Sequence, residues 1–251
     1  MKKRFFAICS LLLLTSLLLC SCDGADDAAS TAAATTVATT TAATTEDDTP
    51  AIKRHVPKFE EIDLSDANIE DFEETDEQTD YVLISVEGYG DILIRLFPEV
   101  APATVKNFKT LVANKFYDGL IFHRVIEGFM IQGGGFDTDL AHHPANSIRG
   151  EFNSNGFQNN LAHVEGVLSM ARANDRNSAS SQFFIMHKTS PHLDGEYAAF
   201  GYAADGRDVV DAIAKCSTGY NDIPTENVVI TSAKFVKQKV AVSESQPIEN
   251  A

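Results

Sequence analysis

A regular pattern of apolar and polar positions begins at Tyr81 and continues to Val236. Residues 81–86 and 91–96 are rich in β-branched side chains, and the Gly-containing turn between them is typical of a hairpin. Similar short runs, separated by Gly- and Asn-rich loops, predict further strands at 122–125, 129–132, 167–171, 183–186, 199–202 and 228–236. The pattern therefore predicts a mainly β domain, which we place at residues 81–240.

Two stretches of this region have the spacing of amphipathic helices. The first ends at Ala113 and has Pro102 in its first turn, where a missing amide hydrogen costs nothing. The second covers 207–216, and its apolar residues fall on one face. Many short strands with two helices predict a closed β-barrel with helical ends.

The first 22 residues have the features of a targeting segment. Three basic residues precede an apolar run at 5–19, which is short for a membrane span and typical of a signal peptide. The sequence that follows, Cys20-Ser21-Cys22, resembles the end of a bacterial lipoprotein signal. Cys22 fits best as the lipidated residue, because bulky Leu19 would lie beside the cleavage point if Cys20 were modified. We expect a signal at 1–21; an uncleaved anchor or an ordinary secretory signal are the alternatives, and each places the domain outside the cytoplasm.

The formal charge of −16 is unevenly distributed. Residues 23–50 are nearly all Ala, Thr and Asp, so we interpret 22–50 as a flexible tether. Residues 51–80 carry eleven acidic and three basic side chains among scattered apolar positions. One interpretation of this acidic extension is a solvated segment. The alternative is a segment that packs on the domain or binds a basic partner. We expect residues 241–251 to form a C-terminal tail. The charge excludes a nucleic-acid binder with a globally basic surface.

Three segments of the predicted domain are dense in residues that could form a site: 122–134, 166–172 and 181–195. On neighbouring strands, Arg124 and Gln132 can emerge side by side. Gly133-Gly134-Gly135 resembles a phosphate loop but lacks the following Lys and Ser or Thr, so we expect a tight loop. His142-His143 has no third ligand at suitable spacing, so no metal is expected.

These segments look like the cyclophilin family of peptidyl-prolyl isomerases, from about Tyr81 to Val236. The resemblance implies an eight-stranded antiparallel barrel capped by two helices, catalysis by Arg124 and support of that arginine by Gln132. It implies a proline pocket formed by Phe129, Met130, Phe184 and Leu193. It further implies peptide binding by Ala171, Arg172, Gln182, His192 and Tyr197.

Three positions depart from the family pattern. His192 stands where many members have Trp, Tyr197 where many have His, and Arg172 where Asn is common. The first change predicts weak cyclosporin binding, and the other two bear on substrate preference more than on catalysis.

The function that these observations predict is isomerisation of X-Pro bonds in proteins that fold outside the cytoplasm. Rotation about an amide needs no nucleophile, metal or cofactor, so none is expected. The expected partners are proline-containing polypeptides and a membrane, reached through lipid on Cys22, with a monomeric domain. One alternative is a proline-binding module or chaperone with little turnover. Another is a lipoprotein whose acidic extension recruits a partner while the domain is a passenger.

Overall fold

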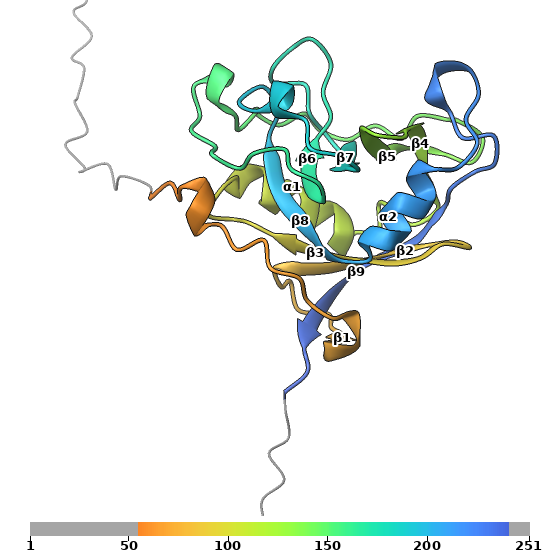
Figure 1. Ribbon diagram of the computed structural model, residues 1–251, viewed down its shortest axis with the longest axis horizontal. Coiled ribbons are helices and arrows are strands. Elements are labelled where there is room, and N and C mark those ends of the chain that lie inside the picture. The colour runs from red at the N-terminus through yellow and green to blue at the C-terminus, as the bar shows by residue number, and fades with distance from the viewer. Residues whose placement is uncertain (1–54, 241–251) are drawn as a thin grey trace, which may run out of the picture. The chain divides into compact units, whose positions relative to one another are not determined.

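The computed structural model describes residues 55–240, which contain nine strands and two α-helices joined by loops and short 3₁₀ turns (Figure 1). The strands are β1 (Phe72–Glu74), β2 (Tyr81–Val86), β3 (Gly90–Leu96), β4 (Leu120–Ile126), β5 (Met130–Asp137), β6 (Val167–Met170), β7 (Phe183–Met186), β8 (Ala199–Asp205) and β9 (Ile230–Gln238). The helices are α1 (Pro102–Ala113) and α2 (Arg207–Ala214). Every strand and helix predicted from Tyr81 onwards is present.

All nine strands belong to one antiparallel sheet in the order β1-β9-β2-β3-β8-β6-β7-β5-β4. The ladder does not return to its first strand. Its last strand approaches the start of β9 through a single bridge between Ile121 and Val229 and a hydrogen bond of 2.9 Å from the Phe122 amide to the Val228 carbonyl. A fully closed eight-stranded barrel therefore stays a prediction, and the mainly β architecture with two helices is confirmed.

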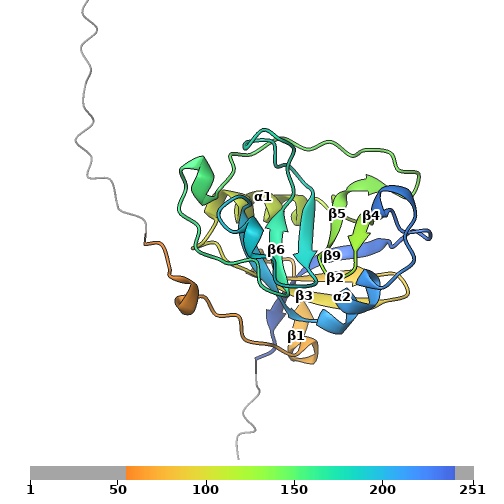
Figure 2. The ribbon, with the colours of Figure 1, turned by 45° about the horizontal axis from the view of Figure 1, so that its top comes forward.

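The two helices lie on different sides of the strands (Figure 2). Helix α1 contacts β9, and α2 contacts β3, β4 and β5. Helix α1 begins with Pro102, as predicted, and the amides of Ala103 and Thr104 donate to the carboxylate of Glu151 at 3.1 and 2.8 Å. Glu151 is buried and distant in sequence, and its negative charge satisfies amides at the positive end of the helix.

An aromatic cluster fills the interior between α1 and the strands. Phe108 of α1 lies 5.2–5.7 Å, between ring centroids, from the rings of Tyr117, Phe183 and Phe200. All four side chains are almost fully buried. Tyr117 donates its hydroxyl to the carbonyl of Ser181 at 3.0 Å, and burial raises its pKa well above the usual value. The cluster therefore fixes the start of β7, a strand that leads into the site.

The acidic extension packs on the domain, which was one of its two expected states. Ile62 is 7% exposed and belongs to the core, and β1 adds a ninth strand that the hydrophobic pattern did not predict. Asp63 pairs with Arg95, and Asp66 accepts a hydrogen bond of 2.7 Å from Arg207. In Figure 1 the orange segment before β2 follows the outside of the sheet.

Several predictions concern residues outside the described range. The signal at 1–21, the lipidated Cys22, the tether at 22–50 and the tail at 241–251 all fall there. Within residues 55–240, no helix is both long and apolar enough to cross a membrane.

Candidate active site

Nine of the predicted site residues line one cavity of about 170 Å³. They are Arg124, Phe129, Met130, Gln132, Ala171, Arg172, Phe184, Leu193 and Tyr197. Both remaining predicted residues of the domain touch this group: Gln182 accepts a hydrogen bond from Gln132, and the ring of His192 stacks on Phe129. The structure therefore brings together all eleven residues that the resemblance singled out within the domain.

Sheet register explains why residues far apart in sequence meet here. Arg124 on β4 lies directly opposite Gln132 on β5, and Gln132 lies opposite Phe184 on β7. Leu193 ends a short 3₁₀ turn, Pro191–Leu193, that follows β7. Because side chains opposite each other on paired strands project from the same face, Arg124, Gln132 and Phe184 share one wall of the cavity.

The guanidinium of Arg124 faces a carboxylate that sequence reasoning did not identify. Its Nε lies 3.3 Å from Oδ2 of Asp222, and both side chains are about 40% exposed. Asp222 belongs to the short 3₁₀ turn Tyr220–Asp222, in the loop between α2 and β9. No residue pattern marks this loop as part of a site, because only the fold brings it to β4.

Gln132 makes its side-chain contacts within the sheet. Its Nε2 donates to Oε1 of Gln182 at 3.0 Å and lies 3.4 Å from Nε2 of His123. Burial lowers the pKa of His123 to about 4, so this ring is neutral beside the cationic Arg124 at physiological pH. The expected support of Arg124 by Gln132 stays a prediction, since the polar contact seen at the guanidinium is with Asp222.

The run Gly133-Gly134-Gly135 is part of β5, so the expectation of a tight loop was wrong. A Cβ on Gly135 would lie 2.4 Å from the side chain of Gln182, and one on Gly134 would lie 2.9 Å from Tyr117. The glycines are needed because neighbouring side chains cross close to the strand. They let Gln182 lie over β5 and reach Gln132.

The apolar part of the cavity rests on a polar array centred on the buried His163. His163 is 1% exposed and stacks against Phe184, with ring centroids 6.0 Å apart. Its Nδ1 lies 3.0 Å from Oδ1 of Asp194, and its Nε2 lies 3.0 Å from the hydroxyl of Ser169. Burial lowers the pKa of His163. Ser169 is fully buried, so this Ser-His-Asp array holds Phe184 in place and does not present a nucleophile.

Arg172 stacks on the rim of the cavity and does not extend into solvent. Its guanidinium carbon lies 4.7 Å from the ring centre of Tyr197 and 5.2 Å from that of Phe152. Its Nε and Nη2 both donate to the carbonyl of Glu196 at 3.1 Å. Two of the three positions that depart from the family pattern, Arg172 and Tyr197, thus form one stacked pair.

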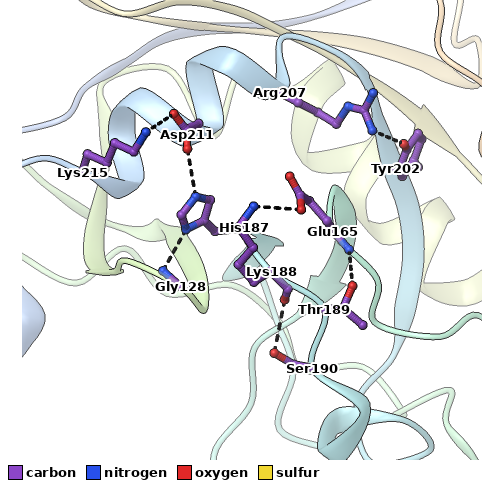
Figure 3. A network of polar contacts seen from close by, with 10 residues as sticks. All are labelled: Gly128, Glu165, His187, Lys188, Thr189, Ser190, Tyr202, Arg207, Asp211 and Lys215. Carbon is purple, nitrogen blue, oxygen red and sulfur yellow. Dashed lines mark hydrogen bonds and ion pairs between the residues drawn. The ribbon is translucent and has the colours of Figure 1, made fainter.

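A second polar network lies against the turn that carries Phe129 (Figure 3). His187, the residue after β7, points its ring between Gly128 of that turn and Asp211 of α2. Lys215 completes the chain by donating to Asp211 at 2.6 Å. This network was not predicted, because a lone His after an apolar strand carries no signal of its own.

The described residues include no group of three or more His, Cys, Asp or Glu side chains arranged to hold a metal ion. His143, from the His-His pair, instead lies 2.8 Å from Asp137. Cys216 is a partly buried thiol whose pKa is raised by burial, which makes it a poor nucleophile.

Comparison with known proteins agrees with this geometry. Residues 81–235 match the family model described as cyclophilin type peptidyl-prolyl cis-trans isomerase/CLD. The chain is 40% identical over 167 residues to peptidyl-prolyl cis-trans isomerase A of Dickeya dadantii, covering 63% of this chain and 85% of the relative. It is 41% identical over 157 residues to peptidyl-prolyl cis-trans isomerase B of Escherichia coli, covering 57% and 93%.

Solved structures show the same likeness. A Cryptosporidium parvum cyclophilin type isomerase, crystallised in the presence of the dipeptide Ala-Pro, matches with a TM-score of 0.53 and 31% identity, over 61% of this chain and 97% of that one. A cyclophilin from Hirschia baltica matches with a TM-score of 0.54 and 27% identity, over 71% and 79%. The chain therefore belongs to the cyclophilin family and is a peptidyl-prolyl cis-trans isomerase.

Proposed function

We propose that this isomerase acts on X-Pro bonds of polypeptides outside the cytoplasm, from a lipid anchor at Cys22, and that the cavity beside Arg124 is its active site. The observation that carries the site assignment is the meeting of a fixed cation with an apolar pocket in one cavity. The lipid anchor rests on the basic start, the apolar run and the Cys20-Ser21-Cys22 sequence.

The chemistry follows from the amide itself. Resonance opposes rotation by ~18–20 kcal/mol, whereas the cis and trans forms of an X-Pro bond differ by only about 0.5–1 kcal/mol. In the twisted state the prolyl nitrogen loses conjugation and regains a lone pair. A cation that donates to this lone pair binds the twisted state more strongly than either planar state, which lowers the barrier. In our proposal Arg124 supplies this cation.

The environment of Arg124 suits that role. Its Nε faces Asp222, so the terminal nitrogens can be turned toward the cavity. Arginine remains charged at any physiological pH, and its planar fork loses little freedom when one edge is held. Met130, Phe184 and Leu193 are buried around the cavity and can hold the proline ring by apolar contact. When the proline ring is held in the pocket, the residue that precedes proline can rotate about the amide bond relative to the ring.

Exchange spectroscopy on an Ala-Pro peptide tests the site. The wild-type chain should accelerate cis–trans exchange, and Arg124→Ala should lower kcat by about 100-fold or more, as loss of a preorganised donor does elsewhere. The exposed Arg149, which does not line the cavity, is the matched control, and Arg149→Ala should leave exchange unchanged. A wild-type chain that binds the peptide without accelerating exchange would establish the binding-module alternative.

The anchor is tested separately in cells. Mass spectrometry of the mature chain should find a lipid-modified cysteine at position 22, and Cys22→Ser should move the protein from the membrane to the soluble fraction. Cys20→Ser should leave both unchanged. A mature chain that begins elsewhere, or an unmodified Cys22, would refute the anchor without affecting the isomerase assignment.

A further inference from the structure

His187 lies against Gly128 in the turn between β4 and β5 (Figure 3). The same turn contains Phe129, which lines the cavity. The side chain of His187 is 6% exposed. The turn is closed by a hydrogen bond of 3.1 Å from the Phe129 amide to the Ile126 carbonyl, and Gly128 has a φ of 80°. A left-handed residue at this position is readily supplied by glycine.

The main chain of His187 also holds Phe129 directly. The carbonyl of Phe129 accepts hydrogen bonds from the amides of His187 at 2.9 Å and Lys188 at 3.2 Å. The ring of the same histidine accepts a hydrogen bond from the amide of Gly128, at 2.8 Å to Nδ1. His187 therefore contacts the Glu127–Gly128 peptide through its ring and the Phe129–Met130 peptide through its own amide.

These contacts determine which ring nitrogen carries the proton. Because Nδ1 accepts from a backbone amide, a neutral ring must carry its hydrogen on Nε2. Nε2 lies 3.1 Å from Oδ1 of Asp211 and donates to it. Lys215 donates to the other oxygen of Asp211 at 2.6 Å, and both contacts lower the pKa of this carboxyl, so it is ionised at physiological pH.

We propose that His187 is a positioning residue for the isomerase: its neutral Nε2–H form fixes the Gly128–Phe129 turn and thereby the ring that contacts proline. Protonation of Nδ1 turns the acceptor into a donor that faces the Gly128 amide. The hydrogen bond is then lost, and the Gly128 part of the turn is held less firmly. The inference rests on the proposed role of the Phe129 cavity in binding proline.

The Gly128 part of the turn has room to move when it is held less firmly. A Cβ built on Gly128 would have no atom within 4 Å, apart from its chain neighbours, so the space on that side of its Cα is open. Phe129 itself is only partly buried and rests on His192, with ring centroids 5.7 Å apart. The hydrogen bond to His187 thus restrains Gly128, beside the backbone hydrogen bonds that hold the amide and carbonyl of Phe129.

Charged groups act on His187 from each element packed against it. Asp211 of α2 favours the protonated ring, while Lys215 of the same helix end opposes it. Glu127 of the turn helps to raise the pKa of Lys215, so it favours the charged form of this lysine. Lys188, the next residue, is paired with Glu165 at 3.0 Å. The Gly128 amide, with its hydrogen pointing at Nδ1, adds a specific cost to protonation at that atom.

Two substitutions separate the two ring contacts. His187→Asn places an oxygen where Nδ1 was, so it can accept from Gly128 and cannot titrate. His187→Gln places its amide near Nε2, so it can bind Asp211 but leaves the Gly128 amide without an acceptor. In the full chain, His187→Gln should raise KM for an Ala-Pro peptide about three- to tenfold, the size expected for losing one hydrogen bond within the protein. It should change kcat little, because a less firmly held Phe129 weakens binding of the ground state and the transition state equally.

The pH profile gives the readout that a purely structural role would not change. Exchange spectroscopy avoids a coupling protease, so KM can be followed from about pH 8 to about pH 5. The wild-type KM should rise on acidification, and the KM of His187→Asn should stay close to the wild-type neutral value throughout. Identical KM values and pH profiles in the wild type and both variants would overturn the proposal.

The wild type alone gives a second test, which does not depend on the variants folding. The amide resonance of Gly128 should shift with pH, with the same midpoint as the His187 ring signals and as the rise in KM. A Gly128 resonance that stays constant while the His187 ring titrates would also overturn the proposal. Failure of the proposed function looks different, because the wild-type chain would then show no catalysed exchange at any pH.

Discussion

Nε of Arg124 and Oδ2 of Asp222 lie 3.3 Å apart, although 98 residues separate them in the sequence. Asn221 and Asp222 both have left-handed backbones, with φ of 59° and 61°. Their loop is closed by a hydrogen bond of 2.8 Å from the Gly219 amide to the Ile223 carbonyl. An unusual backbone at two successive residues thus carries a carboxylate to the proposed catalytic cation.

Replacing Asp222 by Asn should lower kcat/KM about two- to fivefold, the range expected for losing one partly exposed ion pair. Asn tolerates the left-handed conformation, so the loop should keep its shape while the charge is removed. The measurement is exchange spectroscopy on an Ala-Pro peptide. Asp208→Asn, an exposed change of the same kind on α2, serves as the control. Equal losses in both variants would argue against a specific role for Asp222.

Stability should fall in acid because the fold holds a buried histidine, His163, and a half-buried one, His123, in neutral form. Burial lowers the pKa of His163, and lowers that of His123 from 6.5 to about 4. As the pH falls below 6.5, the unfolded chain takes up protons that the folded chain does not, so the free energy of unfolding decreases. For His123 the loss should continue to about pH 4. Urea unfolding at a series of pH values measures this dependence.

A non-titrating ring at position 123 isolates that contribution. His123→Phe should flatten the dependence of the unfolding free energy between pH 6.5 and about 4, because phenylalanine does not titrate. The new ring can pack against the adjacent ring of Phe136, as that of His123 does. His55, whose side chain is 83% exposed, is the control, and His55→Asn should leave the slope unchanged. An unaltered slope in His123→Phe would show that other groups cause the acid sensitivity.

The acidic extension should contribute to folding through Ile62. Ile62→Ala should lower the free energy of unfolding by about 2–4 kcal/mol, which is typical of truncating a buried aliphatic side chain. Thermal or urea unfolding measures the change, with the exposed Glu60→Ala as control. A loss below about 0.5 kcal/mol, as for an ordinary surface substitution, would mean that the extension does not stabilise the domain.

Substitution of Leu140 should stabilise the protein, because this residue has a left-handed backbone that leucine disfavours. It is 48% exposed and has a φ of 59°, in a turn closed by a hydrogen bond of 3.0 Å from its amide to the Asp137 carbonyl. Asn tolerates this backbone better than Leu, so Leu140→Asn should raise the free energy of unfolding by up to about 1 kcal/mol. Leu140→Gly should gain less, because it also increases the freedom of the unfolded chain. A lower melting temperature for Leu140→Asn would contradict this account.

Local patterns predicted the regular elements well. The alternation of apolar residues located the strands from Tyr81 onwards, and Pro102 located the first residue of α1. The same reasoning missed β1, because Phe72-Glu73-Glu74 has no apolar alternation and becomes a strand by pairing with β9. It also mistook the three glycines of β5 for a loop, since the reason for them is the close passage of Gln182 and Tyr117.

The residues of the site also fall into those that local sequence predicted and those that it did not. Motifs that resemble a family identified Arg124, Phe129 and the other cavity residues, and the structure brings them together. Asp222 and His187 were not predicted, because each gains its place through a contact between segments distant in sequence. A sequence shows which side chains are unusual for a strand or loop, but not which loop will lie against them.

The pairing of β1 with β9 has a consequence for how molecules behave when they are crowded. Without β1, the end of β9 at Val236–Gln238 would present unpaired backbone groups to any other chain, a recognised route to aggregation. The edge that replaces it is three residues long and carries Glu73 and Glu74, which pair with Lys237 and Lys234 of the same molecule. An edge of three residues with charged side chains along it offers a second copy little backbone to pair with. Copies held close together, as on a common surface, would thereby be kept from joining their sheets.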